Sequence, residues 1–160
     1  MVAAWSLMIA MVMVSAVTDL LERRIYNALT FPLMLVGIGL HAFSAEGGEW
    51  WQGIAGLFAL GLPFFGLYAI ASGAVLGAGD VKLLMAIGAL AGVRLGLTIG
   101  VVSILLGGAL SFVSLMGAGR LGDVVRAFRP AADPRESLKA PYGLAIAGAT
   151  FLSLAAQHVQ

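Results

Sequence analysis

The chain has 160 residues, of which 61% are hydrophobic and only 11% are charged, and its formal net charge is +1. Because a soluble domain averages about 45–50% apolar and about 25% charged residues, this composition excludes an ordinary soluble protein and indicates a membrane protein whose partner is the lipid bilayer. The small net charge gives no reason to expect a nucleic-acid partner. The absence of cysteine excludes disulfides, thiolate metal sites and cysteine nucleophiles.

Six apolar segments predict an all-α polytopic membrane protein with six transmembrane helices. A helix needs about 20 predominantly apolar residues to cross the hydrocarbon core, so six spans use about 120 residues and leave no room for a sizeable soluble domain. We therefore expect a single intramembrane domain over residues 1–160. In chain order, the segments run over residues 2–18, 28–43, 51–76, 83–93, 95–116 and 142–156.

The distribution of lysine and arginine predicts the orientation in the membrane. With the N-terminus outside the cytoplasm, eight of the nine basic residues fall on inner connections and only Arg94 falls on an outer one. Since cytoplasmic connections carry an excess of basic residues, we expect both termini to be extracytoplasmic. The inner residues are Arg23, Arg24, Lys82, Arg120, Arg126, Arg129, Arg135 and Lys139.

The longest connection contains an amphipathic segment near residues 119–129. Its apolar and charged side chains fall on different helical faces, which is typical of a segment that lies in the headgroup plane of an anionic membrane. Two roles stay open for it: a basic anchor of the topology, or a direct grip on a substrate. The apolar face has Leu121, Val124, Val125 and Phe128, and the charged face has Arg120, Asp123, Arg126 and Arg129.

Two aspartates stand at the ends of predicted spans. Asp19 ends the first span, and Asp80, in the stretch GAGDVK, opens the fourth. In the expected topology both lie near the cytoplasmic face, so their carboxylates share about the same depth. An ionisable group at membrane depth costs at least about 2.5 kcal/mol to insert, and its default interpretation is functional. The alternative is that both are ordinary interfacial residues, and position alone does not decide between these two interpretations.

A facing pair of carboxylates has a specific chemistry. Like charges in close contact cannot both ionise at low cost, so one carboxylate keeps a proton while the other stays anionic. Such a pair supplies a general base and a general acid at one pH, which suits the attack of water on a peptide carbonyl. Gly77 and Gly79, next to Asp80, permit close approach of a backbone. A substrate can pair with main chain exposed in this way as an added strand.

Three stretches of the chain together resemble the type IV prepilin peptidases, which are GxGD-type intramembrane aspartic proteases. The stretches are TDLLERRIYNALT (18–30), GAGDVKLL (77–84) and APYGLAI (140–146), and the resemblance covers essentially the whole chain. In one departure, the family usually has Ile-Pro-Asn where this chain has Ile25-Tyr26-Asn27. Tyr26 has a backbone N–H that proline would lack, which puts the local turn, rather than the aspartates, in question.

The resemblance implies a role for each matching position. It implies that Asp19 and Asp80 are the catalytic aspartates and that Gly77 and Gly79 are the motif glycines of the second one. Neither a metal nor an organic cofactor is expected. Supporting positions without an assigned role are Arg24, Ile25, Asn27 and Lys82, and the late segment contributes Pro141 and Gly143.

The resemblance also implies a function. An enzyme of this family resides in the bacterial inner membrane and removes a short, hydrophilic, positively charged leader from a pilin precursor. The cut falls on the cytoplasmic side, after a glycine and just ahead of the precursor's apolar helix. Because the chain has no cysteine and no inserted cytoplasmic domain, it resembles the short, peptidase-only form that serves Flp-type tight-adherence pili. A methyltransferase domain is not expected.

Two other classes of function stay open on the residues alone. A small ion- or proton-coupled transport subunit would use Asp19 and Asp80 as a relay, since intramembrane carboxylates serve that purpose too. A passive assembly scaffold would need neither aspartate. Asparagine at either position would damage an enzyme and a transporter alike, so a cut product is the observation that separates them.

Overall fold

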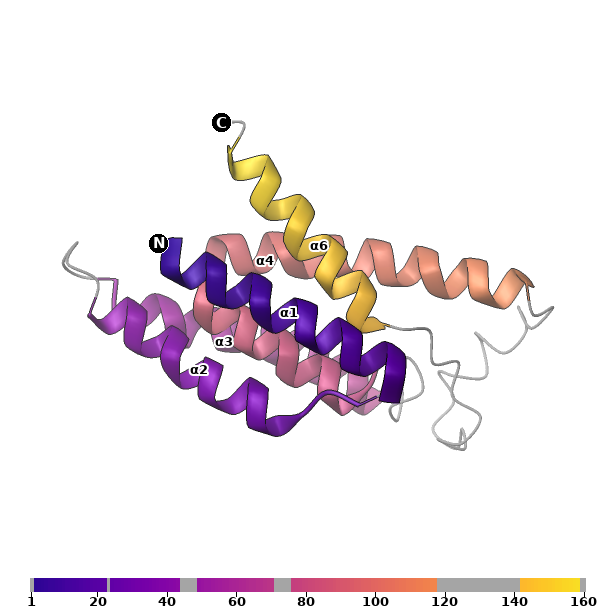
Figure 1. Ribbon diagram of the computed structural model, residues 1–160, viewed down its shortest axis with the longest axis horizontal. Helices are drawn as coiled ribbons and strands as arrows, with labels where there is room; N and C mark the ends of the chain where they lie inside the picture. Colours follow the sequence, from indigo (N-terminus) through magenta and orange to yellow (C-terminus); the bar gives the residue numbers. More distant parts are fainter. Residues whose placement is uncertain (1, 23, 44–48, 71–75, 118–141, 159–160) are drawn as a thin grey trace.

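The computed structural model describes residues 2–22, 24–43, 49–70, 76–117 and 142–158, and every regular element in these ranges is a helix (Figure 1). The all-α prediction is therefore confirmed. The amphipathic segment expected near residues 119–129 lies outside the described ranges. The helices are α1 (Val2–Glu22), α2 (Asn27–Ala42), α3 (Trp51–Ile70), α4 (Ala78–Gly117) and α6 (Tyr142–His158).

Helix α4 changes direction along its length. Its 40 residues include Gly92, whose φ of 74° and ψ of −176° are not helical. A Cβ on Gly96 would lie 3.5 Å from the Cα of Gly88, whereas residues eight apart in a continuous helix are separated by about 12 Å. The chain therefore turns back at Gly92. We call residues 78–91 the first arm of α4 and residues 93–117 the second arm.

The turn at Gly92 lies near the end of the predicted fourth segment (83–93), two residues before Arg94, which separates it from the fifth (95–116). The fourth and fifth predicted segments correspond to the two arms of α4, which are two helices joined at this glycine. A positive φ is costly for a residue with a Cβ and not for glycine. The N–H of Val93, at the start of the second arm, donates to Oε1 of Gln52 in α3 at 3.3 Å. The N–H groups in the first turn of a helix have no acceptor in that helix, and the Gln52 side chain supplies one for Val93.

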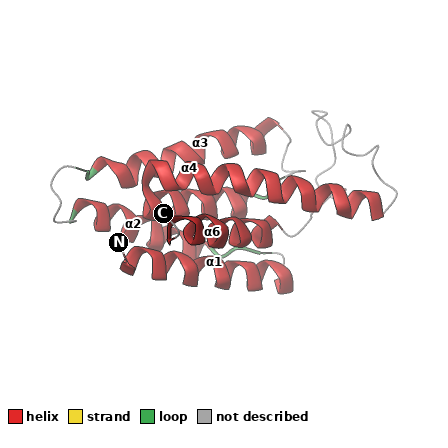
Figure 2. Cartoon of the chain, turned by 90° about the horizontal axis from the view of Figure 1, so that it is seen from above, coloured by secondary structure: helices red, strands yellow, loops and turns green. Residues whose placement is uncertain are grey.

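Helix α3 packs along both arms of α4 (Figure 2). Its residues meet the first arm in antiparallel order and the second arm in parallel order, as two arms of opposite direction require. The two backbones are so close that a Cβ on Gly56 would collide with the backbone of Gly88. Small residues let membrane helices pack in this way. The contacts are Gly56 with Gly88 and Gly61 with Met85 on the first arm, and Leu60 with Gly96 and Phe64 with Gly100 on the second arm.

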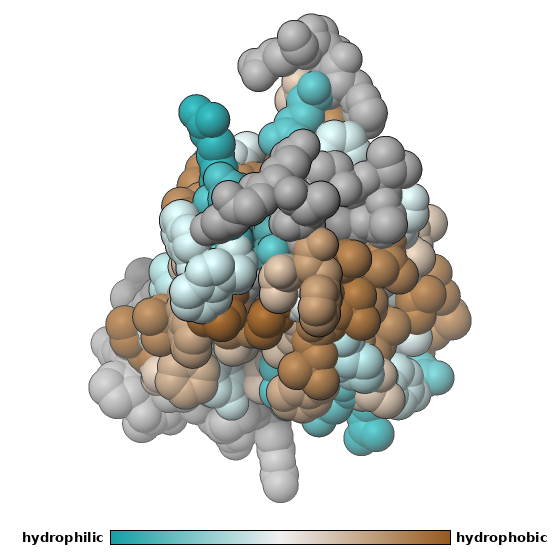
Figure 3. Space-filling view, turned by 90° about the vertical axis from the view of Figure 1, so that its left-hand side faces the viewer, coloured by the Kyte–Doolittle hydropathy of each residue, from teal (hydrophilic) through white to brown (hydrophobic). Residues whose placement is uncertain are grey.

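The surface of the bundle suits lipid better than water. Within the described ranges, three helices have windows long and apolar enough to cross a membrane, namely Trp5–Glu22, Trp51–Ile70 and Ala78–Val113, while α2 and α6 are apolar but shorter. In the view of Figure 3, hydrophobic residues gather across the middle of the molecule, and hydrophilic residues lie above and below them. Large apolar side chains such as Leu35 and Leu62 are 72% and 65% exposed. These features support a membrane protein, whereas six crossings and extracytoplasmic termini stay predictions.

The contact between Gly56 and Gly88 predicts a stability effect. We expect Gly56→Ala to lower the free energy of unfolding by about 1–3 kcal/mol, because its methyl group would force the two backbones apart. Gly66→Ala is the matched control in the same helix, since a Cβ at that position meets nothing within 4 Å. Unfolding of both variants in detergent, followed by circular dichroism, measures the difference. Equal stability of the two variants would contradict the packing of α3 on α4.

Candidate functional site

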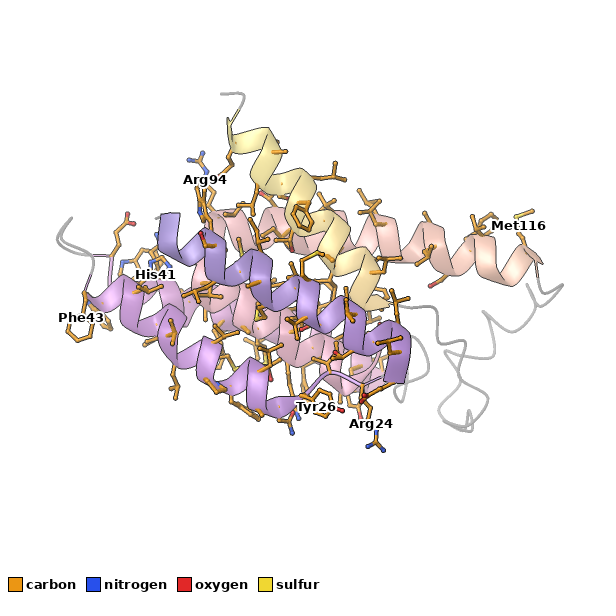
Figure 4. The ribbon with its side chains drawn as sticks, in the orientation of Figure 1. Arg24, Tyr26, His41, Phe43, Arg94 and Met116 are labelled. Atoms are coloured by element: carbon orange, nitrogen blue, oxygen red, sulfur yellow. The ribbon has the colours of Figure 1, made fainter. Side chains whose placement is uncertain are left out.

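The two aspartates lie at one end of the bundle. Asp19 belongs to the last turn of α1, and Asp80 belongs to the first turn of α4. The end of α1 and the beginnings of α4 and α6 lie together at this end (Figure 1). Tyr26 and Arg24 mark the same end, whereas His41, Phe43 and Arg94 lie at the other (Figure 4). We call the first of these the aspartate end.

Asp80 is held by the backbone that begins its own helix. Gly77 precedes α4, and its carbonyl oxygen accepts the first helical hydrogen bond, from the N–H of Val81 at 3.3 Å. In return, Oδ2 of Asp80 accepts the N–H of Gly77 at 3.0 Å. This is the return contact of a capping box, and the positive end of the helix dipole also favours a negative charge there. Asp80 is 8% exposed, so these contacts stabilise a buried carboxylate.

The motif glycines have different contacts. A Cβ on Gly77 would lie 3.0 Å from Oδ2 of Asp80, so a side chain there would crowd the carboxylate directly. A Cβ on Gly79 would lie 3.0 Å from Cβ of Ile25, which belongs to the connection between α1 and α2. Gly77 therefore leaves room for the aspartate, and Gly79 lets the connection approach the first turn of α4.

Lys82 and Asn27 join the same two parts of the chain. Nζ of Lys82 donates to Oδ1 of Asn27, the first residue of α2, at 2.9 Å. The ammonium group also lies 5.5 Å from the centre of the Phe31 ring, within the range of a cation–π interaction. The two supporting positions named from the resemblance therefore contact each other. They attach the start of α2 to the start of α4.

Tyr26 and Arg24 lie on the outside of the connection. The Tyr26 hydroxyl donates to the Glu22 carboxylate, and this hydrogen bond raises the pKa of the phenol above its ordinary value. Arg24 is exposed and points away from the bundle (Figure 4). Tyr26 has a φ of −78° and a ψ of 128°, which proline also adopts. The dihedrals at position 26 are therefore ones that proline could also have.

Asp19 is held by the start of α6. Its Oδ2 accepts the N–H of Gly143, the second residue of α6, at 3.0 Å. The N–H groups in the first turn of a helix have no acceptor within that helix, and Asp19 supplies one from across the bundle. A Cβ on Gly143 would lie 2.8 Å from this same oxygen and 3.0 Å from Cβ of Asp19. Gly143 therefore contacts Asp19 directly, whereas Pro141 lies outside the described ranges.

Tyr142 is a site residue that the sequence did not single out. It is 7% exposed, and its ring lies against Gly107 in the second arm of α4. Only its aromatic place between Pro141 and Gly143 hinted at a role. At the start of α6, Tyr142 thus contacts Gly107 of α4, and the next residue, Gly143, contacts Asp19 of α1.

The arrangement provides two carboxylates at one end of an apolar bundle, each with an oxygen that accepts a backbone N–H from the start of a helix. Such a pair can exchange protons with a bound substrate and water. Among the residues that the structure describes, no group of three or more histidine, cysteine or acidic side chains is placed to hold a metal ion.

Comparison with known proteins identifies a family. The profile of the type IV leader peptidase family matches residues 6–112, which is more than half of the chain. The match contains Asp19 and Asp80 and ends before Tyr142 and Gly143. It supports the peptidase reading and gives no support to a transport subunit. No curated protein and no solved structure matches the chain significantly.

The contact between Gly143 and Asp19 predicts an energetic coupling. We expect Gly143→Ala to destabilise the wild-type protein more than it destabilises the Asp19→Ala variant, because the new methyl group collides with the Asp19 side chain. The coupling should be about 1–2 kcal/mol in a double-mutant cycle measured by unfolding in detergent. Gly148→Ala is the control in the same helix, since its Cβ would meet Leu106 at an ordinary 3.5 Å. Additive effects of Gly143→Ala and Asp19→Ala would contradict the contact.

Proposed function

Because the chain belongs to the type IV leader peptidase family, we propose that it is an intramembrane aspartic endopeptidase in which Asp19 and Asp80 form the catalytic pair. The observation that carries the proposal is the position of these two carboxylates. They come from helices far apart in the sequence and lie at the same end of the bundle, in the last turn of α1 and the first turn of α4 (Figure 1). Each also accepts a backbone N–H beside a helix start.

The proposed reaction is the hydrolysis of one peptide bond. The anionic aspartate takes a proton from water while the water oxygen bonds to the carbonyl carbon, and the protonated aspartate gives its proton to the carbonyl oxygen. The resulting tetrahedral intermediate breaks its C–N bond, and the leaving nitrogen receives a proton from the pair. One water is consumed, and the products are a new carboxyl group and a new amine. Which aspartate holds the shared proton is a property of the pair.

The proposed substrate is a prepilin of the Flp type, cut after a glycine between its leader and its apolar helix. Membership of the family supports a prepilin as the substrate class.

The aspartate end carries Arg24 and Lys82, and the other end carries Arg94. Together with the basic residues of the connection between α4 and α6, this favours the aspartate end as the cytoplasmic one, in a bacterial inner membrane. We propose a peptidase-only enzyme that does not methylate its product.

Cleavage of a prepilin by the purified protein tests the proposal. We expect mass spectrometry to show a product shortened by the leader, and Asp19→Asn and Asp80→Asn each to reduce the rate by about 100-fold or more, because each removes a proton-transfer group. Glu49→Gln is the control, since this exposed carboxylate precedes α3 at the other end of the bundle. An uncut precursor with folded wild-type protein would overturn the peptidase proposal. A transport subunit would give that result.

The pH dependence of cleavage tests the shared proton. At low pH both carboxyl groups are protonated and the base is lost, and at high pH both are anionic and the acid is lost. The rate should therefore pass through a maximum and fall on both sides. Measuring the initial rate of product formation at each pH gives the profile, with circular dichroism as the control for folding. A rate that stays constant from about pH 5 to about pH 9 would contradict a pair that shares one proton.

A further inference from the structure

The first turn of α2 is weakly held by its own helix. Tyr26 precedes the helix and makes no side-chain capping hydrogen bond, so the first N–H groups of α2 gain no acceptor from its side chain. Pro32 lies inside the helix and has no N–H, so it cannot donate the helical hydrogen bond to the carbonyl of Ala28. Residues 27–31 therefore depend on the rest of the bundle for their position.

Lys82 of α4 supplies contacts to this turn. Its Nζ donates to Oδ1 of Asn27 at 2.9 Å and lies 5.5 Å from the centre of the Phe31 ring. Because Asn27 and Phe31 are four residues apart, they share one face of α2, and the ammonium group contacts both ends of the turn. A cation near the start of a helix gains nothing from the helix dipole. The stability of α4 therefore does not explain a lysine at this position.

The contact lies close in the chain to both aspartates. Its lysine is two residues after Asp80, and its asparagine is eight residues after Asp19, where the connection from α1 joins α2. In the same connection, Ile25 packs on the first turn of α4, since a Cβ on Gly79 would lie 3.0 Å from its Cβ. Helix α1 itself packs more against α6 than against α4. The connection is therefore a main route by which α4 fixes the end of α1.

We propose that Lys82 is a positioning residue that sets the spacing of Asp19 and Asp80. By binding the first turn of α2, it holds the connection, and with it the end of α1, against the start of α4. The proposal rests on the proposed function, because this spacing governs the shared proton of the pair and its reach to one substrate. Farther along α2, a Cβ on Gly37 would collide with the backbone of Ala89. Loss of the Lys82 contact therefore releases the start of α2 without detaching the helix.

The distance between the ends of α1 and α4 tests the proposal without a substrate. The chain has no cysteine, so nitroxide labels can be placed at Leu20→Cys and Ala78→Cys alone, two exposed positions beside the aspartates. Electron paramagnetic resonance then measures the distance distribution. We expect Asn27→Leu and Lys82→Met to broaden it toward longer distances, and Asn27→Asp, which keeps an acceptor for the ammonium group, to match the wild type. Arg94→Met is the control, since it removes a basic side chain of α4 at the other end of the bundle (Figure 4).

The kinetics of cleavage test the consequence for the carboxylate pair. We expect Asn27→Leu to lower kcat about 3- to 10-fold with KM nearly unchanged, because it loosens the pair without touching the substrate. Carboxylates that are farther apart repel each other less, so the shared proton leaves at lower pH, and the alkaline limb of the pH profile should move to lower pH. Asn27→Asp should keep kcat near the wild-type value. A residue that only fills space would leave the alkaline limb in place.

The Asn27→Leu variant keeps every charge of the site, so a moved limb reports the spacing of the pair and not a lost charge. The titratable side chains that the structure describes near this end are Asp19 and Glu22 of α1, Arg24 and Tyr26 of the connection, Tyr68 of α3, Asp80 and Lys82 of α4, and Tyr142 of α6.

The outcomes separate the positioning role from the peptidase proposal. An unchanged distance distribution in Asn27→Leu and Lys82→Met overturns the positioning role, even if the protein cuts no precursor. Wild-type kcat and alkaline limb in Asn27→Leu also overturn it and leave the peptidase proposal standing. A broadened distribution in a protein that cuts nothing supports the role of Lys82 in the spacing and rejects the peptidase.

Discussion

This site depends on hydrogen bonds from backbone N–H groups to two carboxylates, the buried Asp80 and the partly buried Asp19. A carboxylate in an apolar bundle is costly unless donors surround it, and the start of a helix offers N–H groups that lack partners. Asp80 uses the start of its own helix, and Asp19 uses the start of α6. The shared proton of the proposed mechanism depends on repulsion between the two carboxylates, which makes ionisation of both at once costly.

Glycine controls how closely the parts of this site approach. In lipid, association of helices depends on close packing and on hydrogen bonds between them, because lipid chains are as apolar as the helices. Gly143 allows α6 to reach the side chain of Asp19, Gly107 allows α4 to reach Tyr142, and Gly88 allows α4 to reach α3. Gly66 and Gly108 have no such neighbour, so the high glycine content reflects specific contacts at some positions and not at others.

Several features of the fold follow from short stretches of sequence, and they agree with the structure. Apolar segments bounded by charged residues predicted helices, and the interruption of α4 at Gly92 falls two residues before the predicted boundary at Arg94. The Gly77 and Asp80 contact also spans only three residues. The missing proline put the turn at Tyr26 in question, and the backbone there has a φ of −78°, which proline also allows.

The sequence by itself determined the helices and the acidic residues at their ends, because hydropathy and helix starts depend on residues close together in the chain. It named Gly143 by resemblance alone and gave Tyr142 no role. Only the tertiary structure joined Gly143 to Asp19 across 124 residues and seated Tyr142 on Gly107. Such pairings depend on how helices cross and on which residues are small enough to let them approach, and these are properties of the packed bundle.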